Sequence, residues 1–378
     1  MLARTFGCAR FAYNWALQLR RDAYHDDGQS LSYGDTSKRL TALKKDPDHE
    51  WLKEVSSVPV QQALRHLDMA YQRFFRKQSR FPSFKSRRGK QSAEYTTSGY
   101  RLKDSNVKGQ PLVYLAKMAG PLKIRWSRPL PSAPKTIHVT RDKAGRYFVS
   151  FRVTRNPDPL AKTKRSVGVD IGLKDVATTV DDLGRMWKSG NPRHLKQDLA
   201  RLKRAQRSLA KKQKGSANWE KARRKVARLH ARVSDRRRDF LHKLTTRLVR
   251  DYDCIVVEDL AVKNMVKNHA LAQAISDVGW GELVRQLKYK AEWYGKEVVV
   301  IDRFYPSSKR CSECGWINAA LSLGDRDWRC EECDAEHDRD ANAAQNILAV
   351  GHTVAASGEV VSLDSIQHAS GKEESHVL

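Results

Sequence analysis

The run SVGVDIG at residues 166–172 has the pattern of a buried β-strand, and it ends on a carboxylate, Asp170. A second apolar run, CIVVEDL at 254–260, ends in the same way on Glu258. Both runs are short and rich in β-branched residues, which favours strands over helices. A carboxylate is expensive to desolvate in such a segment unless it meets a cation or a strong donor. The two runs therefore predict a metal site built on adjacent strands.

A third acidic residue, Asp340, lies in HDRDANAAQNI at 337–347, a segment rich in Ala that predicts a closely packed helix. Two strand carboxylates and one helix carboxylate suit a divalent-metal phosphodiesterase. Paired metals about 3.5 to 4 Å apart need hard oxygen ligands, and phosphate oxygens complete their shells. Phosphodiester cleavage is the leading chemistry. The alternative for each carboxylate is an ion pair with one of the many arginines.

Four of the six cysteines fall within residues 311–333, as two CxxC pairs. Zinc needs four ligands converging from two tight turns, and this spacing lies within the range of a zinc ribbon. Two disulfides are the alternative, but the chain shows no secretory feature. We therefore expect Cys311, Cys314, Cys330 and Cys333 to bind structural Zn²⁺, and Cys8 and Cys254 to be buried thiols.

The chain has 378 residues and a formal net charge of +28, so two or three domains and a polyanionic partner are expected. Nucleic acid is the first candidate, because phosphate contacts supply affinity independent of sequence. An anionic membrane is the rival, yet the sequence has no apolar run of transmembrane length. We expect a cytoplasmic, nucleoid-associated protein without a membrane contact.

Residues from the start to about Phe75 repeat apolar positions at helical spacing. The following segment interleaves phenylalanines with cations, a composition that suits nucleic acid because aromatic faces stack on bases while cations reach phosphates. A solvated basic face over core phenylalanines is the alternative. The cations of this segment are Arg73, Arg76, Lys77, Arg80, Lys85, Arg87 and Arg88.

Between about 94 and 153 the pattern changes to short strands, with YFVSFRV, PLKIRW and TIHVTR as candidates for a small β-barrel or meander. Residues 193–250 return to helix and hold 21 Lys or Arg against four acidic residues. They predict a helical hairpin with one apolar and one cationic face. Its candidate phosphate contacts are Arg223, Arg224, Lys225, Arg236 and Arg237. A third apolar strand, KEVVVI, precedes the cysteines.

Together these motifs resemble a known family, the transposon-encoded TnpB proteins. These are RNA-guided DNA endonucleases related to compact type V CRISPR effectors. The matching strings are SVGVDIGLKDVAT (166–178), RRRDFLHKLTTRLVRDYDCIVVEDL (236–260), DVGWGELVRQLKYKAEWYGKEV (277–298), FYPSSKRCSECG (304–315) and CEECDAEHDRDANAAQNI (330–347). The similarity extends over nearly the whole chain.

The resemblance implies a multidomain α/β fold with an RNase H-like (RuvC) nuclease domain split by an inserted zinc ribbon. In this scheme 1–92 form a helical recognition lobe, 93–160 a wedge β-barrel and 161–308 the first part of the nuclease domain, including the basic hairpin 193–250. The zinc ribbon takes 309–335, the last part of the nuclease domain 336–350, and 351–378 are expected to be a disordered tail. Family members usually begin with a strand and a short helix ahead of RTFGCARFAYNWAL, whereas this chain starts almost directly there. If that strand belongs to the wedge barrel, we expect either an unfilled edge in the barrel or a natural start further upstream.

The family's catalytic carboxylates, which hold two Mg²⁺ ions, match Asp170, Glu258 and Asp340. Arg326 matches a basic position beside that site, and Tyr33 and Gln61 fall in the lobe that reads the short motif flanking the target. The resemblance implies a monomeric ribonucleoprotein with a guide RNA that cleaves double-stranded DNA. A non-cleaving zinc-containing repressor and a strand-transferring transposase remain the alternatives.

Overall fold

The chain forms two compact units in the computed structural model, which describes residues 1–104, 110–322 and 324–357. The first unit comprises residues 1–156 and 211–228, and the second comprises 157–210 and the chain from Leu229 onward. None of the described helices combines the length and the hydropathy that a membrane span requires.

Helices make up the first half of the first unit, as the sequence predicts. The described elements are α1 (Leu2–Asp27), α2 (Tyr33–Leu43), the 3₁₀ helix η1 (Pro47–Lys53) and α3 (Ser57–Phe75). Small residues on α1 allow α3 to approach closely, and their shared core includes Ala12, Ala16 and Leu64. A capping box at Ser32, which satisfies free backbone amides, fixes the start of α2.

Strands complete the first unit in two small antiparallel sheets. One has the order β1-β4-β5, and the other pairs β2 with β3. The bounds are β1 (Gln91–Thr96), β2 (Tyr100–Lys103), β3 (Leu112–Leu115), β4 (Thr136–Arg141) and β5 (Tyr147–Arg152), with the 3₁₀ turn η2 (Thr97–Gly99) between β1 and β2. Among the described residues these pairings do not close a barrel, so the wedge barrel stays a prediction.

The expected strand PLKIRW is absent, and the prediction for this segment was wrong. Residues 121–126 form no strand, although Leu122 N donates to the Val113 carbonyl at 2.8 Å. Leu122, Ile124 and Trp126 pack against the core of the small sheets. The alternation in the sequence therefore indicated partial burial of every second side chain. Pro121 at its start, which has no N–H to donate, explains part of the missing ladder.

The second unit is built on a five-stranded mixed sheet with the order β10-β9-β6-β7-β8. β6, β9 and β10 run parallel, while β7 and β8 continue the sheet as antiparallel strands. The bounds are β6 (Ser166–Asp170), β7 (Thr178–Asp181), β8 (Met186–Lys188), β9 (Cys254–Glu258) and β10 (Glu297–Ile301). The three strands that the apolar runs predict are thus confirmed and are neighbours.

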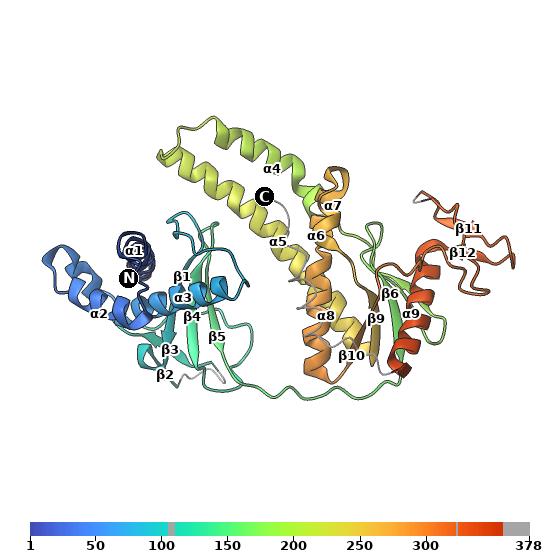
Figure 1. Ribbon diagram of the computed structural model, residues 1–378, viewed down its shortest axis with the longest axis horizontal. Coiled ribbons are helices and arrows are strands. Elements are labelled where there is room, and N and C mark those ends of the chain that lie inside the picture. Colours follow the sequence, from blue (N-terminus) through green and yellow to red (C-terminus); the bar gives the residue numbers. More distant parts are fainter. Residues whose placement is uncertain (105–109, 323, 358–378) are drawn as a thin grey trace. The chain divides into compact units, whose positions relative to one another are not determined.

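Helices cover both faces of this sheet (Figure 1). Val167, Val169 and Ile255 point to one face and pack against α5 (Ala217–Asp251) and α8 (Trp280–Tyr294). Val256 follows Ile255 on the same strand, so its side chain points to the other face, where it packs against α9 (Arg339–Ser357). The sheet is therefore buried on both sides, which explains why its strands are continuously apolar.

Two glycines let α9 lie directly on the sheet. A Cβ at Gly168 would stand 2.0 Å from the carbonyl oxygen of Ala344, and one at Gly351 would stand 2.3 Å from the side chain of Val256. Only glycine fits at either position without displacing the helix. α9 also continues beyond 350 into the segment expected to be disordered, because Val354 packs on the same core. Residues 358–378 of that expected tail lie outside the described residues.

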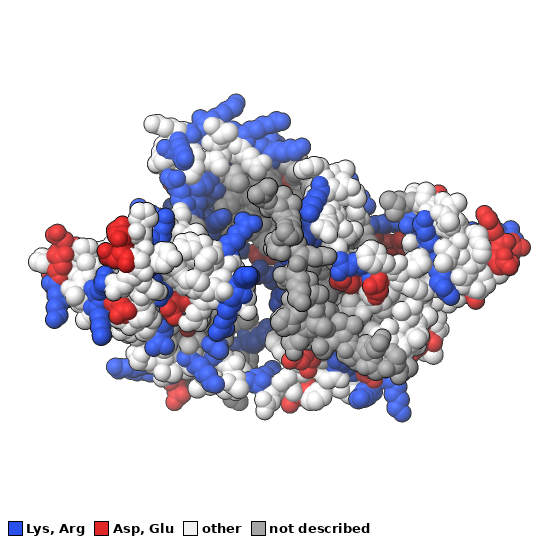
Figure 2. Space-filling model, viewed as in Figure 1, with Lys and Arg blue, Asp and Glu red and all other residues white. Residues whose placement is uncertain are grey.

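The basic segment forms a helical hairpin of α4 (His194–Ala210) and α5, joined by a turn at 211–216. Figure 2 shows Lys and Arg side chains gathered over its outer part. Leu202, Leu241 and Leu248 are buried, which confirms the apolar face. Residues 211–228, the tip of the hairpin, group with the first unit. The other domain boundaries stay predictions.

The remaining elements are two short helices, α6 (Val262–Met265) and α7 (His269–Val278), and two strands of the cysteine module, β11 (Asp327–Arg329) and β12 (Glu336–Asp338).

A buried lysine connects α8 to α5. Lys290 lies on α8, and its Nζ donates to the His242 carbonyl and to the hydroxyls of Thr245 and Thr246 at 2.7 to 2.9 Å. This contact ties α8 to α5 beneath the sheet.

Gly168→Ala should destabilise the second unit, because the new methyl group meets backbone atoms that cannot rotate away. We expect a loss of roughly 3 kcal/mol or more in the free energy of unfolding, measured by urea denaturation. Gly281→Ala on α8 is the matched control, since a Cβ there meets nothing within 4 Å. Its stability should be unchanged or raised by up to about 1 kcal/mol. Equal stability of the two variants would contradict the close packing of α9.

Candidate metal centre and acidic cluster

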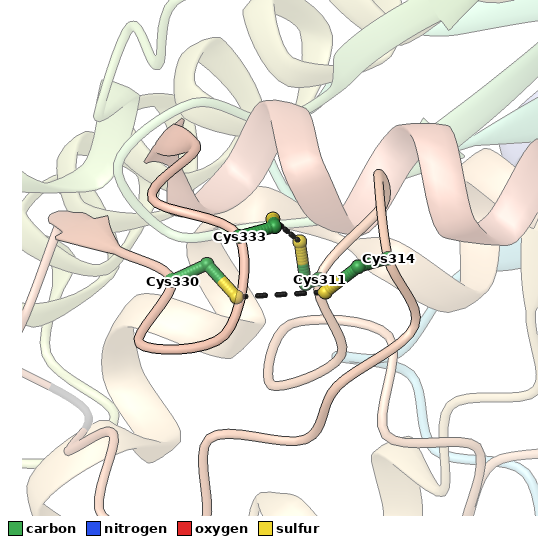
Figure 3. A group of neighbouring side chains, drawn as sticks. All are labelled: Cys311, Cys314, Cys330 and Cys333. Atoms are coloured by element: carbon green, nitrogen blue, oxygen red, sulfur yellow. Dashed lines mark hydrogen bonds between the residues drawn. The ribbon is translucent and has the colours of Figure 1, made fainter.

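The four cysteines of the two CxxC pairs converge on one point (Figure 3). Their Sγ atoms all lie within 4.8 Å of one another, with Cys311 3.7 Å from Cys333 and Cys314 3.6 Å from Cys330. A tetrahedral zinc site with Zn–S bonds of about 2.3 Å requires sulfur atoms about 3.8 Å apart. The cluster therefore has the donor set and the spacing of a four-thiolate zinc site.

The two CxxC pairs form equivalent turns. Gly315 N donates to the Cys311 carbonyl and Asp334 N donates to the Cys330 carbonyl, both at 3.0 Å. The residue after each second cysteine has a left-handed backbone, with φ of 82° at Gly315 and 60° at Asp334. Both turns thus close tightly enough to present two sulfurs each, and the positive φ accounts for glycine in the first.

A histidine that the sequence interpretation missed lies beside the thiols. His337 is buried, and its Nε2 is 3.1 Å from Cys311 Sγ. Its ring also packs on Trp328, with centroids 4.7 Å apart. The signal available in the sequence was its place four residues after Cys333. His337 can donate a hydrogen bond to the Cys311 thiolate without itself binding the metal.

The strand carboxylates Asp170 and Glu258 lie at matching positions on adjacent strands. β6 and β9 are parallel, with Val169 opposite Val257, so each carboxylate is the next residue along its strand. Adjacent parallel strands lie about 4.8 Å apart. The strand register thus places the two carboxylates, Asp170 and Glu258, next to each other at the same edge of the sheet.

Asp340 reaches the same edge from α9. Ala344 lies against Gly168, two residues before Asp170, and Asp340 lies one helical turn before Ala344. Two residues of strand and four of helix both span about 6 Å. The charge of Asp340 acts on Asp170, so α9 runs opposite to β6 here and Asp340 is level with the end of that strand. The structure thus brings all three predicted acidic residues to one edge. Within the described residues, however, the cysteines are the one group of metal-binding type whose ligand atoms all lie within 4.8 Å of each other.

The acidic residues influence one another electrostatically. Burial, together with the charges of Glu258 and Asp340, raises the pKa of Asp170 to about 8. Burial also raises the pKa of Glu258, although a hydrogen bond from Ser307 opposes the shift. Asp170 therefore resists ionisation at neutral pH, and Glu258 ionises less readily than an ordinary glutamate. A bound cation would reverse this, because an opposite charge favours the ionised form.

Neighbouring polar groups orient two of the carboxylates. The Ser307 hydroxyl, on a buried residue, donates to Glu258 Oε1. Arg326 Nη1 lies 3.4 Å from Asp340 Oδ1, so Arg326 lies beside the acidic cluster, and its catalytic role stays a prediction. Ser307 was missed, although its position in FYPSSKRC was visible in the sequence.

The cysteine module is attached directly to α9. Asn342 accepts from Ser312 N at 2.9 Å and donates to the Arg310 carbonyl at 2.7 Å, while Asn346 donates to the same carbonyl at 2.6 Å. Both asparagines are buried. These contacts explain the asparagines of the motif, and they place the first cysteine turn within two helical turns of Asp340.

The predicted nucleic-acid contacts fall into two groups. In the first unit Gln61 and the seven cations at 73–88 are exposed, and Tyr33 lies 5.3 Å beneath the guanidinium of Arg65. In the hairpin Arg224 and Lys225 are exposed, whereas Arg223 pairs with Glu220. Arg236 and Arg237 hold the carboxylates of Asp198 and Asp277 at 3.3 and 3.1 Å. These last two side chains have structural partners, and their contact with nucleic acid stays a prediction.

Zinc should be present at one ion per chain in the purified protein, because four converging thiols bind it tightly. Cys311→Ser should lower the zinc content to a small fraction and lower the melting temperature, measured by elemental analysis and thermal unfolding. Cys254→Ala, in β9, is the control and should keep its zinc. Zinc-free wild-type protein would contradict the assignment.

Asp170→Asn should flatten the pH dependence of stability in buffer without added divalent cations. As the pH rises from about 4 to 8, the carboxyl ionises in the unfolded chain while it stays protonated in the folded one, so stability falls. The asparagine variant lacks this proton linkage. Urea denaturation at pH 5 and 8 measures the difference. Asp239→Asn, at an exposed ion pair with Lys243, should leave the wild-type slope unchanged.

Comparison with family models supports the same set of motifs. Residues 149–269 match a model described as "Probable transposase", 280–347 match "Cas12f1-like, TNB domain" and 1–29 match "Helix-turn-helix domain". In this structure residues 2–27 are one continuous helix. The Cas12f1-like match covers the four cysteines and ends just beyond Asp340.

Two relatives align with nearly the whole chain. A protein of Streptomyces pristinaespiralis is 50% identical over 361 residues, covering 95% of this chain and 87% of the relative, and it carries the name "Putative RNA-guided DNA endonuclease". "Putative RNA-guided DNA endonuclease InsQ" of Escherichia coli K12 is 34% identical over 376 residues, covering 95% and 90%.

A solved structure shares the architecture. The "Cryo-EM structure of the Cas12f1-sgRNA-target DNA complex" contains a chain that superposes with a TM-score of 0.54 at 15% identity, covering 92% of this chain and 81% of that one. The mixed α/β fold is therefore that of Cas12f1. Together with the 50% identical relative and the matching models, this shows that the chain belongs to the TnpB (OrfB_IS605) family.

Proposed function

We propose that this protein is an RNA-guided, transposon-associated DNA endonuclease that hydrolyses target DNA beside a short flanking motif. The observation that carries the proposal is the meeting of Asp170, Glu258 and Asp340 at one edge of the sheet. Binding alone requires no such carboxylates. The names of the two full-length relatives describe the same activity.

The three carboxylates would hold Mg²⁺, because this ion prefers oxygen ligands and because its positive charge would offset the repulsion among the carboxylates. When bound, a pair of such ions activates water and stabilises charge on the phosphate that is cleaved. Ser307 fixes the orientation of Glu258, and Arg326 can stabilise a phosphate oxygen next to Asp340. In this proposal the sheet with its order of parallel and antiparallel strands is the RuvC-like, RNase H-type domain.

Sequence selection in this proposal comes from base pairing with a bound guide RNA. A carboxylate site reads no sequence, and one zinc module with a small lobe offers few base contacts. The net charge of +28 suits a protein that holds both guide and target by their backbones. Residues 1–92 would act as the recognition lobe, where Tyr33 and Gln61 read the flanking motif, and 93–160 as the wedge domain.

Cleavage should require both the guide and each acidic residue. Asp170→Ala, Glu258→Ala or Asp340→Ala should each lower the cleavage rate at least a thousandfold, of the order seen when essential catalytic groups are lost, while RNA binding stays within about threefold of wild type. Target plasmid, Mg²⁺ and protein purified with its RNA provide the assay. Asp239→Ala, in an exposed ion pair, is the matched control and should cleave normally.

Two outcomes would contradict the proposal and identify the alternatives. Site-specific cleavage or strand joining that survives RNase treatment of the free protein would indicate a transposase. Binding of RNA and DNA without any divalent-metal-dependent cleavage would indicate a repressor.

A further inference from the structure

In the first unit α1, α3 and the β1-β4-β5 sheet are neighbours (Figure 1). Residues of these elements and of the loop before β1 line a cavity of about 440 Å³. Its volume is in the range of a small-molecule site. Polar side chains line much of it, among them Arg10, Lys85 and Lys90. All of these residues belong to the first unit, and none is part of the acidic cluster or the cysteine module.

Arg10, one of the cations that line this cavity, has a neutral partner. Its Nη1 donates to Gln91 Oε1 at 2.6 Å. The amide nitrogen of Gln91 in turn donates to three carbonyls of the preceding loop, those of Ser86, Arg87 and Gly89. The guanidinium is therefore fixed in place without being neutralised.

Lys85 is fixed in a similar way. Asn14 binds both its backbone groups, accepting from Lys85 N at 2.8 Å and donating to its carbonyl at 3.0 Å. The ammonium lies 3.8 Å from the ring centroid of Tyr13, a buried residue. A ring face attracts the cation but does not cancel its charge. Two cations are thus positioned in advance at this cavity.

One carboxylate lines the described cavity wall, and it is already engaged. Glu94 Oε2 is 2.6 Å from His66 Nε2, and Glu94 Oε1 is 3.6 Å from His138 Nε2. Three cations against one acid leave the wall with a positive excess even when both imidazoles are neutral. Positive charge that neutral groups hold in position is stabilised by a bound anion.

We propose that this cavity is a binding site for the phosphate group of a nucleotide, with Arg10 and Lys85 as its principal contacts. The proposed function enters only as the source of the ligand, since a guide or target strand would supply the nucleotide phosphate. A free mononucleotide supplies the same chemistry. Glu94 then limits the affinity by opposing the ligand's charge.

Titration calorimetry on the full-length Asp170→Ala protein tests this at pH 7, with thymidine 5′-monophosphate and thymidine as probes. The variant keeps the measurement separate from cleavage, so failure of the nuclease proposal would leave it intact. We expect the monophosphate to bind at least about tenfold more tightly than thymidine, because charge-assisted hydrogen bonds carry the contact. Equal affinity for the two probes would overturn the proposal.

Variants with opposite signs sharpen the test. Arg10→Gln and Lys85→Met should each weaken monophosphate binding roughly tenfold, whereas Glu94→Gln should strengthen it. Arg101→Gln, an exposed arginine of the same unit that is absent from the cavity wall, is the matched control. Thermal unfolding confirms that each variant folds. Affinities within twofold of wild type for both Arg10→Gln and Lys85→Met would overturn the assignment.

A second pair of probes separates the two sources of the phosphate. A ten-nucleotide single strand with and without a 5′-phosphate should differ in affinity if a chain end enters the cavity, and the difference should vanish in Arg10→Gln. Equal binding of both strands, with monophosphate binding retained, would restrict the ligand to a free nucleotide. Loss of strand binding in Arg10→Gln regardless of the end would indicate an internal phosphate.

Discussion

The contact on which the second unit depends is the direct approach of α9 to β6 at Gly168. A helix normally packs on a sheet through intervening side chains, and here the backbone of one turn replaces them. That closeness carries Asp340 to the edge where Asp170 and Glu258 end their strands. Any side chain at Gly168 would lift the helix and separate the third carboxylate from the other two. The acidic cluster is therefore a consequence of backbone packing more than of local sequence.

Gathering these carboxylates has an electrostatic cost. Burial and mutual repulsion raise the pKa of Asp170 to about 8, while Arg326 and Arg339 oppose the shift without cancelling it. Elsewhere in the protein a fully buried carboxylate has cationic partners, as Asp198 has in Arg201 and Arg236. A buried carboxylate that lies among other carboxylates, with too little positive charge nearby to balance them, is a candidate functional residue. A divalent cation offsets that cost in the function we propose.

Much of the second unit could be predicted because its signals are local. The apolar runs at 166–172 and 254–260 identify strands, and the spacing of Cys311, Cys314, Cys330 and Cys333 identifies the cysteine module. The antiparallel strands β7 and β8 could not be recognised in this way, since they are only four and three residues long. PLKIRW shows the opposite error, because alternation reports burial and says nothing of hydrogen-bond pairing. Ser307 and His337 were missed since their roles arise from contacts between distant segments.

The same helix connects the cysteine module to the acidic cluster. Asn342 and Asn346, about half a turn and nearly two turns after Asp340, bind the backbone of the first cysteine turn. On the other side, Arg339 N donates to the Arg326 carbonyl at 2.7 Å, which holds the guanidinium of Arg326 near Asp340. In the proposal that Zn²⁺ joins the four thiols, loss of the ion would loosen the cysteine module and with it both attachments to α9. The cysteine module is therefore part of what positions Asp340 and Arg326, although no cysteine contributes to the chemistry at the sheet edge.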